Sequence, residues 1–96
     1  MGSEALLSNT SKDTLLFYNL TKGALRIGNI QSSDNWNLPN IGQFSLAGGK
    51  NTLASGNQAF AFGDNSIATG SSSIALGKNT ESTGNYSFAA GQASVI

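Results

Sequence analysis

The sequence predicts an all-β solenoid over residues 43–96, a chain wound into coils of two short strands each. Glycine recurs there at every seventh residue without a break, at Gly49, Gly56, Gly63, Gly70, Gly77, Gly84 and Gly91. Within each unit small and large side chains alternate, as in Ser73-Ile74-Ala75-Leu76, which is the period of a β-strand. A seven-residue period is also typical of a coiled coil, but each glycine inside a helix lowers its stability by about 1 kcal/mol. A glycine in every heptad therefore argues against a coiled coil. Each unit is therefore a strand that ends at a corner, where glycine permits a positive φ.

The units alternate between two kinds, and this doubles the period to 14 residues. Every second unit begins with a charged residue and an asparagine: Lys50-Asn51, Asp64-Asn65 and Lys78-Asn79. Coils stacked at the sheet spacing of about 4.8 Å bring like positions together. We therefore expect Lys50, Asp64 and Lys78 to form one column in which Asp64 pairs with the two lysines. Asn51, Asn65 and Asn79 should form a ladder at the same corner, where amides bond to one another and tolerate tight backbone.

The fourth position of each unit is large and apolar, and we expect these side chains to point into the coil. They are Leu46, Phe60, Ile74 and Phe88 in one strand and Leu53, Ile67 and Val95 in the other, with Glu81 interrupting the second column. The Ser, Thr and Ala side chains would then form a flat outer face, which either packs against another chain or is solvated. Because so thin a core is marginal alone, a side-by-side homo-oligomer is the favoured arrangement.

The first 42 residues are expected to precede the solenoid as a tail and a cap. Residues 1–13 are predicted to be a flexible tail or tag. Residues 14–20 and 24–30 are predicted strands, joined by a hairpin or a tight crossover, and a loop follows that contains Trp36. Trp36 either folds over the open hydrophobic end or stacks on a sugar or base. The apolar residues 94–96 predict that the chain continues in a longer protein or that its end docks onto a partner.

The composition narrows the possible functions to binding. Five Lys and Arg balance five Asp and Glu, and His and Cys are absent. No basic field is available for nucleic acid, and thiolate or imidazole catalysis and most metal sites are excluded. The apolar runs are too short to span a bilayer. The segments Gly49-Lys50 and Gly77-Lys78 lack the spacing of a phosphate-binding loop. We therefore expect no catalytic residue, no metal and no cofactor.

The stretch NSIATGSSSIALGKNT, residues 65–80, resembles the head repeat of YadA-like trimeric autotransporter adhesins, whose signature is Asn-Ser-Val-Ala-Ile-Gly-Ser. The similarity covers 43–96, and a looser similarity covers the segment before it. The resemblance implies a left-handed parallel β-roll, a homotrimer around a common axis and an extracellular place on the cell surface. Thr69 and the run Glu81-Ser82-Thr83 depart from the motif. The missing stalk and membrane anchor leave the mode of display open.

The resemblance implies the head of a fibrous surface adhesin that binds a matrix protein such as collagen, or a cell-surface glycan. The candidate ligand-facing residues are Asn65, Ser66, Ala68, Ser71, Ser73 and Ala75. One alternative is a receptor-binding or shaft segment of a phage or contractile-injection tail fibre, which shares the repeat. The weaker alternative is an ice-binding solenoid, because Ser, Thr and Asn columns at the sheet spacing can order water.

Overall fold

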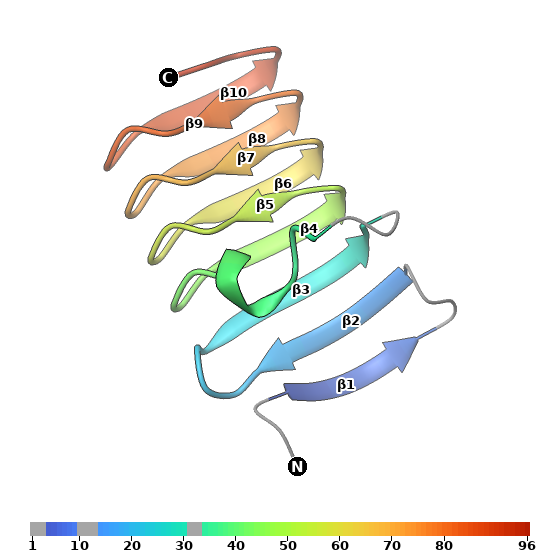
Figure 1. Ribbon diagram of the computed structural model, residues 1–96. Coiled ribbons are helices and arrows are strands. Elements are labelled where there is room, and N and C mark those ends of the chain that lie inside the picture. Colours follow the sequence, from blue (N-terminus) through green and yellow to red (C-terminus); the bar gives the residue numbers. More distant parts are fainter. Residues whose placement is uncertain (1–3, 10–13, 31–33) are drawn as a thin grey trace.

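The computed structural model describes residues 4–9, 14–30 and 34–96 and shows a stack of β-coils (Figure 1). Its wide sheet has seven strands in the order β1 (Glu4–Asn9), β2 (Thr14–Asn19), β3 (Ala24–Asn29), β4 (Leu46–Lys50), β6 (Phe60–Asp64), β8 (Ile74–Lys78) and β10 (Phe88–Gln92). Its narrow sheet has three strands, β5 (Leu53–Ala54), β7 (Ile67–Ala68) and β9 (Glu81–Ser82). A short 3₁₀ helix covers Leu38–Asn40. Among the residues described, no helix has the length and apolarity needed to cross a membrane.

The register of the strands confirms the 14-residue coil. In the wide sheet Leu46 lies beside Phe60, Phe60 beside Ile74, and Ile74 beside Phe88, all in parallel strands. In the narrow sheet Leu53 pairs with Ile67 and Ile67 with Glu81, and a bridge to Val95 continues that column. The two kinds of unit therefore form different sheets, and the chain is the β-solenoid that the sequence predicts.

The left-handed residue of each corner is the second residue of the unit. Those residues have φ between 54° and 62°: Phe44, Asn51, Gln58, Asn65, Ser72, Asn79, Tyr86 and Ala93. The N–H of such a residue donates to the previous coil, as Gln58 does to the Gln43 carbonyl at 2.7 Å and Asn65 to the Lys50 carbonyl at 2.8 Å. The corners therefore extend the hydrogen bonding between neighbouring coils.

The repeat glycines form two sets, one in the strands of the wide sheet and one after the strands of the narrow sheet. The expectation that they all have a positive φ is correct only for the set in the wide sheet. Gly49, Gly63, Gly77 and Gly91 have φ between 98° and 130°. The prediction is wrong for Gly56, Gly70 and Gly84, which do not have a positive φ. At Gly56 and Gly70 the reason for glycine is close stacking, because a Cβ there would overlap the carbonyl oxygen of the equivalent glycine in the next coil.

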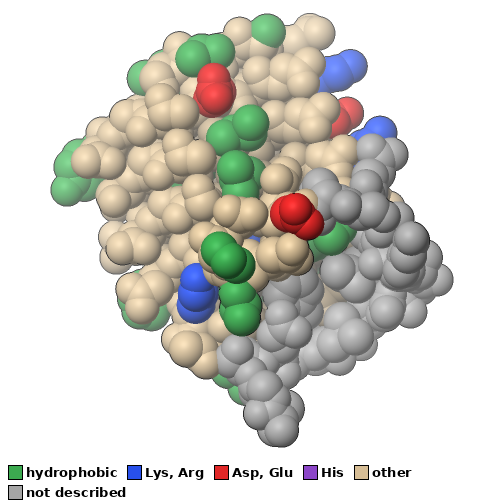
Figure 2. All heavy atoms as spheres, in the orientation of Figure 1, with side chains coloured by type: hydrophobic (Ala, Val, Ile, Leu, Met, Phe, Trp, Pro, Cys, Tyr) green, Lys and Arg blue, Asp and Glu red, His purple; other side chains and the backbone are tan. Residues whose placement is uncertain are grey.

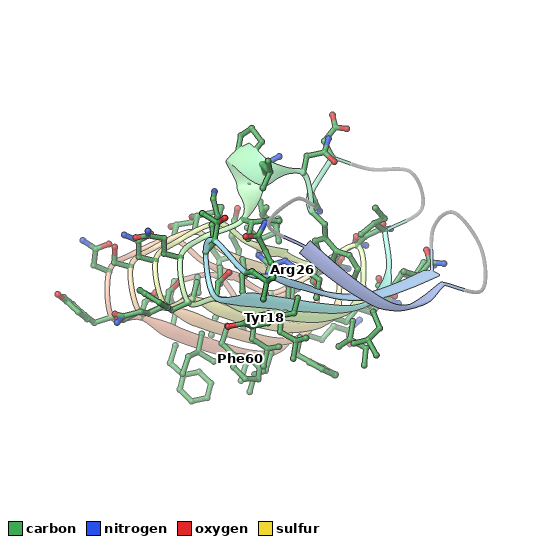
Figure 3. The ribbon with its side chains drawn as sticks, turned by 90° about the horizontal axis from the view of Figure 1, so that it is seen from below. Tyr18, Arg26 and Phe60 are labelled. Carbon is green, nitrogen blue, oxygen red and sulfur yellow. The ribbon has the colours of Figure 1, made fainter. Side chains whose placement is uncertain are left out.

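The side chains point opposite to the prediction, because the small residues fill the coil and the large ones lie outside it. Fourteen Ser, Thr and Ala side chains of the described residues are at most 3% exposed: Ala24, Ser45, Ala47, Thr52, Ala54, Ala59, Ala61, Ser66, Ala68, Ser73, Ala75, Thr80, Ser82 and Ala89. The predicted inward residues Leu46, Phe60, Ile74, Phe88, Leu53, Ile67 and Val95 are half-buried or exposed. Figure 3 shows Phe60 on the outer side of the wide sheet and Arg26 on the inner side. Short corners hold the two strands of a coil so close that only small side chains fit at native packing density.

Most of the buried hydroxyl groups bond to carbonyl groups or to one another, and Thr52 Oγ1 is the exception among the described residues. Ser73 Oγ donates to the Gly70 carbonyl at 2.7 Å, and Ser66 Oγ donates to the Gly77 carbonyl at 2.8 Å. Thr80 Oγ1 donates to Ser66 Oγ at 3.0 Å, from one coil to the one before it. These bonds explain why Ser and Thr are tolerated in the core, because a buried polar group is costly only when it is unsatisfied.

An antiparallel hairpin continues the wide sheet at its N-terminal end. β3 pairs in parallel with β4, with Leu25 beside Leu46, and β2 pairs antiparallel with β3. The two predicted strands thus form a hairpin rather than a crossover. β1 pairs antiparallel with β2, so the prediction of a flexible tail is wrong for Glu4–Asn9; residues 1–3 and 10–13 lie outside the described part. β1 depends on hydrogen bonds to β2, which the short stretch EALLSN does not signal by itself.

The loop after β3 covers the N-terminal edge of the narrow sheet (Figure 1). Trp36 Nε1 donates to the Thr52 carbonyl at 3.0 Å, and the Gly42 N–H and Arg26 Nη2 both donate to the Ala54 carbonyl at 3.0 Å. Trp36 is only 4% exposed, which confirms that it folds over the structure and leaves no ring face for a sugar or base. The loop occupies the carbonyl groups of an otherwise open strand edge.

Arg26 fills the interior of the first coil, where the next coil has Ala47 in register. Its side chain is fully buried and donates to Ser45 Oγ at 3.0 Å and to the Leu25 carbonyl at 2.9 Å. Burial lowers the pKa of the guanidinium from its ordinary value to about 10, since desolvation disfavours the charged form.

We expect the wild type to gain stability at alkaline pH relative to an Arg26→Met variant. Above the folded pKa of about 10 and below the higher, ordinary pKa of arginine, the unfolded chain binds more protons, so the free energy of unfolding rises with pH. From about pH 9 to about pH 11 the difference between the two proteins should change by about 1 kcal/mol in favour of the wild type. Urea unfolding of both proteins at these pH values measures it. If the free energies of unfolding of the wild type and the Arg26→Met variant changed with pH in the same way, the effect of burial on the Arg26 pKa would be contradicted.

Candidate functional site

The outer face of the wide sheet carries two apolar columns that no other part of the described chain covers. The first contains Leu25, Leu46, Phe60, Ile74 and Phe88, and the second contains Ile27, Gly48, Phe62, Leu76 and Ala90. Tyr18 of the hairpin lies on the same side (Figure 3). Ile27 is 42% exposed and Phe62 45%, and neither column contains a charged residue. A continuous exposed apolar face of this kind is typical of an interaction surface.

In the second apolar column the ring of Phe62 lies over Gly48, which has no side chain. A Cβ at Gly48 would lie 2.8 Å from Phe62 Cδ2 and 3.1 Å from Cγ2 of Ile27, so the ring of Phe62 occupies the space that a side chain would need. The rings of Phe60 and Phe62 are 6.4 Å apart and tilted by 38°. The missing side chain at Gly48 therefore leaves no hole between Ile27 and Phe62 in the second column.

The outer face of the narrow sheet is more mixed in character. One column contains Leu53, Ile67, Glu81 and Val95, and the neighbouring column contains Ser55, Thr69 and Thr83. Ile67 and Glu81 are half-buried, and Thr69 is exposed. This face therefore combines apolar contact area with hydroxyl groups.

The charged corner consists of Lys50-Asn51, Asp64-Asn65 and Lys78-Asn79. The register places Lys50 beside Asp64 and Asp64 beside Lys78, which confirms the predicted column, and Figure 2 shows the alternation of blue, red and blue along one edge of the coils. The predicted pairing of Asp64 with the lysines is wrong, since no ion pair joins these three residues of the described chain. Exposed ion pairs gain little and long side chains lose rotamer entropy in forming them. The three asparagines have φ between 54° and 59°, which confirms their tolerance of tight backbone.

The opposite corner, which we call the uncharged corner, contains residues 43–44, 57–58, 71–72 and 85–86. It holds amide, hydroxyl and aromatic side chains only: Gln43, Phe44, Asn57, Gln58, Ser71, Ser72, Asn85 and Tyr86. Ser72 Oγ donates to Gln58 Oε1 at 3.1 Å, and the Ser71 N–H donates to Asn85 Oδ1 at 2.9 Å. Phe44 is 67% exposed and Tyr86 81%. This corner is not among the sites predicted from the sequence, although the 14-residue spacing of Phe44, Gln58, Ser72 and Tyr86 is a signal for it.

The ligand-facing surface predicted from the sequence is not one surface. Ser66, Ala68, Ser73 and Ala75 are fully buried inside the coil, so no ligand reaches them. Asn65 is exposed at the charged corner, whereas Ser71 is half-buried at the uncharged corner. The error follows from the reversed direction of the side chains. The third-position Ser and Thr columns line the interior, so the ice-binding alternative would have to rest on the outer column of Ser55, Thr69 and Thr83 and on the Asn column of the charged corner, and it stays a prediction.

Comparison with known families supports the geometry of the repeats. The model of the YadA head domain repeat matches twice, over residues 47–73 and 68–94. No curated protein and no solved structure matches the chain. The two copies together span residues 47–94, half of the 96-residue sequence, and they coincide with the stacked coils from β4 to β10. With its 14-residue coils, small buried side chains and these two matches, the chain belongs to the family of the YadA head domain repeat.

Proposed function

We propose that this chain is the head segment of a fibrous, cell-surface adhesin in which three copies pack with their wide sheets turned toward a common axis. The observation that supports this arrangement is the pair of apolar columns on the outer face of the wide sheet, with Ile27, Phe62 and Phe88 between 42% and 55% exposed. Covering apolar surface contributes about 25 cal/mol per Å², so association of three such faces is favourable. YadA head domains belong to surface-exposed adhesins and form homotrimers, and the family match extends that expectation to this chain.

The same arrangement leaves the narrow sheet facing outward, and we propose that it binds the ligand. Ile67 lies in β7, and Asn65 and Thr69 lie just before and just after this strand, within the repeat that resembles the family signature. They offer an apolar side chain, an amide and a hydroxyl. An extracellular-matrix protein such as collagen is the ligand class proposed for this surface. Three identical surfaces around one axis bind a repetitive ligand with greater avidity than one surface alone.

An Ile67→Asp variant is expected to lower collagen binding about tenfold or more while it leaves the trimer intact, because a central apolar contact is replaced by a solvated carboxylate. Binding to immobilised collagen and molar mass by light scattering are measured on the same samples. The wild type should have three times the 9.8 kDa mass of one chain at all concentrations tested.

The matched control is Leu38→Ser, which removes an apolar side chain that is 52% exposed on the 3₁₀ helix of the capping loop, away from β7. It should bind collagen as the wild type does. A monomeric or dimeric wild type overturns the trimeric head. A trimer in which Ile67→Asp and Leu38→Ser bind equally overturns the assignment of the narrow sheet as the ligand surface.

A further inference from the structure

We infer that the two corners of the coil recognise each other between neighbouring protomers, so that the uncharged corner of one chain lies on the charged corner of the next. This inference rests on the proposed trimer and adds the contacts that decide how its chains are arranged. The partner is a second copy of this chain. The evidence is the geometry of a threefold ring and the contrast in charge between the two corners.

The geometry follows from turning three equal faces toward one axis. In cross-section the three wide sheets form a triangle, and each side of the triangle is a strand such as β6 with a corner at either end. Rotation about the axis keeps the direction of the strands, so the start of one strand meets the end of the next. Phe44, Gln58 and Ser72 precede β4, β6 and β8, whereas Lys50, Asp64 and Lys78 end those strands. Each uncharged corner therefore meets a charged corner, as in a heterologous interface that closes into a ring.

A threefold rotation does not shift the chains along the axis, so each coil of one protomer lies at the same height as the equivalent coil of its neighbour. The corners of equivalent coils therefore meet. Phe44 lies at the level of Lys50 of the neighbouring protomer, and an exposed aromatic ring is a suitable partner for an ammonium group. Gln58 lies at the level of Asp64, where an amide can donate to a carboxylate. Ser72 lies at the level of Lys78, where a hydroxyl can accept from an ammonium group. Each pairing joins complementary groups and contains no like charges.

Pairing of the charged corner with its own copy is unfavourable in either direction when the two columns are aligned over their full length. The column has the charges of Lys50, Asp64 and Lys78 in the order positive, negative, positive, which is the same from both ends. Parallel copies would place Lys50 opposite Lys50, and antiparallel copies would place Lys50 opposite Lys78 and Asp64 opposite Asp64. Like charges at close range oppose association. The uncharged corner receives the whole column at equal height without placing like charges together, as the closed ring requires.

The test places a charge of each sign at two positions of the uncharged corner. Gln58→Glu should face Asp64 of the neighbouring protomer and weaken the trimer, whereas Gln58→Lys should strengthen it. Ser72→Lys should face Lys78 and weaken the trimer, whereas Ser72→Glu should strengthen it. Each weakening should raise the half-assembly concentration about tenfold, and salt should reduce the differences. Gln58 and Ser72 have φ of 61° and 56°, so the substitutions share one backbone conformation. The charged corner of the same chain lies a strand away, about 17 Å, beyond the screening length.

Sedimentation or light scattering over a range of concentrations gives the half-assembly concentration of each variant, and circular dichroism confirms that each remains folded. The preference for Lys at position 58 and for Glu at position 72 is the expected result, and a general effect of net charge cannot produce both. A trimer whose assembly is the same in all four variants, or follows net charge alone, overturns the inference and leaves the proposed function standing. A wild type that does not form trimers overturns both.

Discussion

A Gly70→Ala variant is expected to lose about 4 kcal/mol or more of its free energy of unfolding, whereas Gly84→Ala should remain close to the wild type. A Cβ at Gly70 would overlap the carbonyl oxygen of Gly84 and lie 2.6 Å from its carbonyl carbon and 2.8 Å from the Thr83 oxygen. These atoms are backbone of the next coil, so they cannot move aside without separating the coils. Losses of this size require a named cause such as this clash.

Gly84 is the matched control, because it is the same position of the repeat one coil later. A Cβ there meets Ser87 Cβ at 3.8 Å, an ordinary contact distance. Neither glycine has a positive φ, so alanine is allowed by the backbone at both positions. Urea unfolding followed by circular dichroism measures the two variants. Equal losses at both positions would mean that an intrinsic preference for glycine, rather than coil stacking, determines the repeat.

A Leu76→Glu variant is expected to be folded and monomeric at concentrations where the wild type is trimeric. Leu76 points outward from β8 and pairs with Phe62 and Ala90 in the second apolar column, so its replacement leaves the buried Ser and Ala columns unchanged. Around the proposed axis three carboxylates would come together in an apolar environment. An unpaired buried charge costs roughly 3–5 kcal/mol, which corresponds to about a hundredfold or more in association for each contact.

Thr69→Glu is the control for this variant, because it introduces the same charge on the exposed outer face of the narrow sheet. It should keep the threefold molar mass in light scattering. Loss of the trimer in Thr69→Glu with retention in Leu76→Glu would place the narrow sheet at the axis. Retention in both variants would exclude the apolar face of the wide sheet as the contact between chains.

The repeat could be predicted from the sequence because its period is a property of the chain itself. The seven-residue glycines and the alternation of units that begin with Lys50, Asp64 and Lys78 led to the correct coil length and to the correct neighbours in each column. Asn65 and its equivalents marked a tight corner because asparagine tolerates left-handed backbone. The strand at Glu4–Asn9 could not be found in this way, since it depends on hydrogen bonds to a neighbouring strand.

The sequence by itself determined the coil, its 14-residue period and the column of alternating charges, because these depend only on spacing along one chain. Only the tertiary structure decided which side of each strand is inside. Alternation permits either choice, and hydrophobicity favoured the large residues Phe60 and Ile74 for the core. The narrow distance between the two strands of a coil reverses that choice, because it admits Ser73 and Ala75 and excludes larger side chains. The apolar residues are thereby turned outward, where a neighbouring chain can bury them.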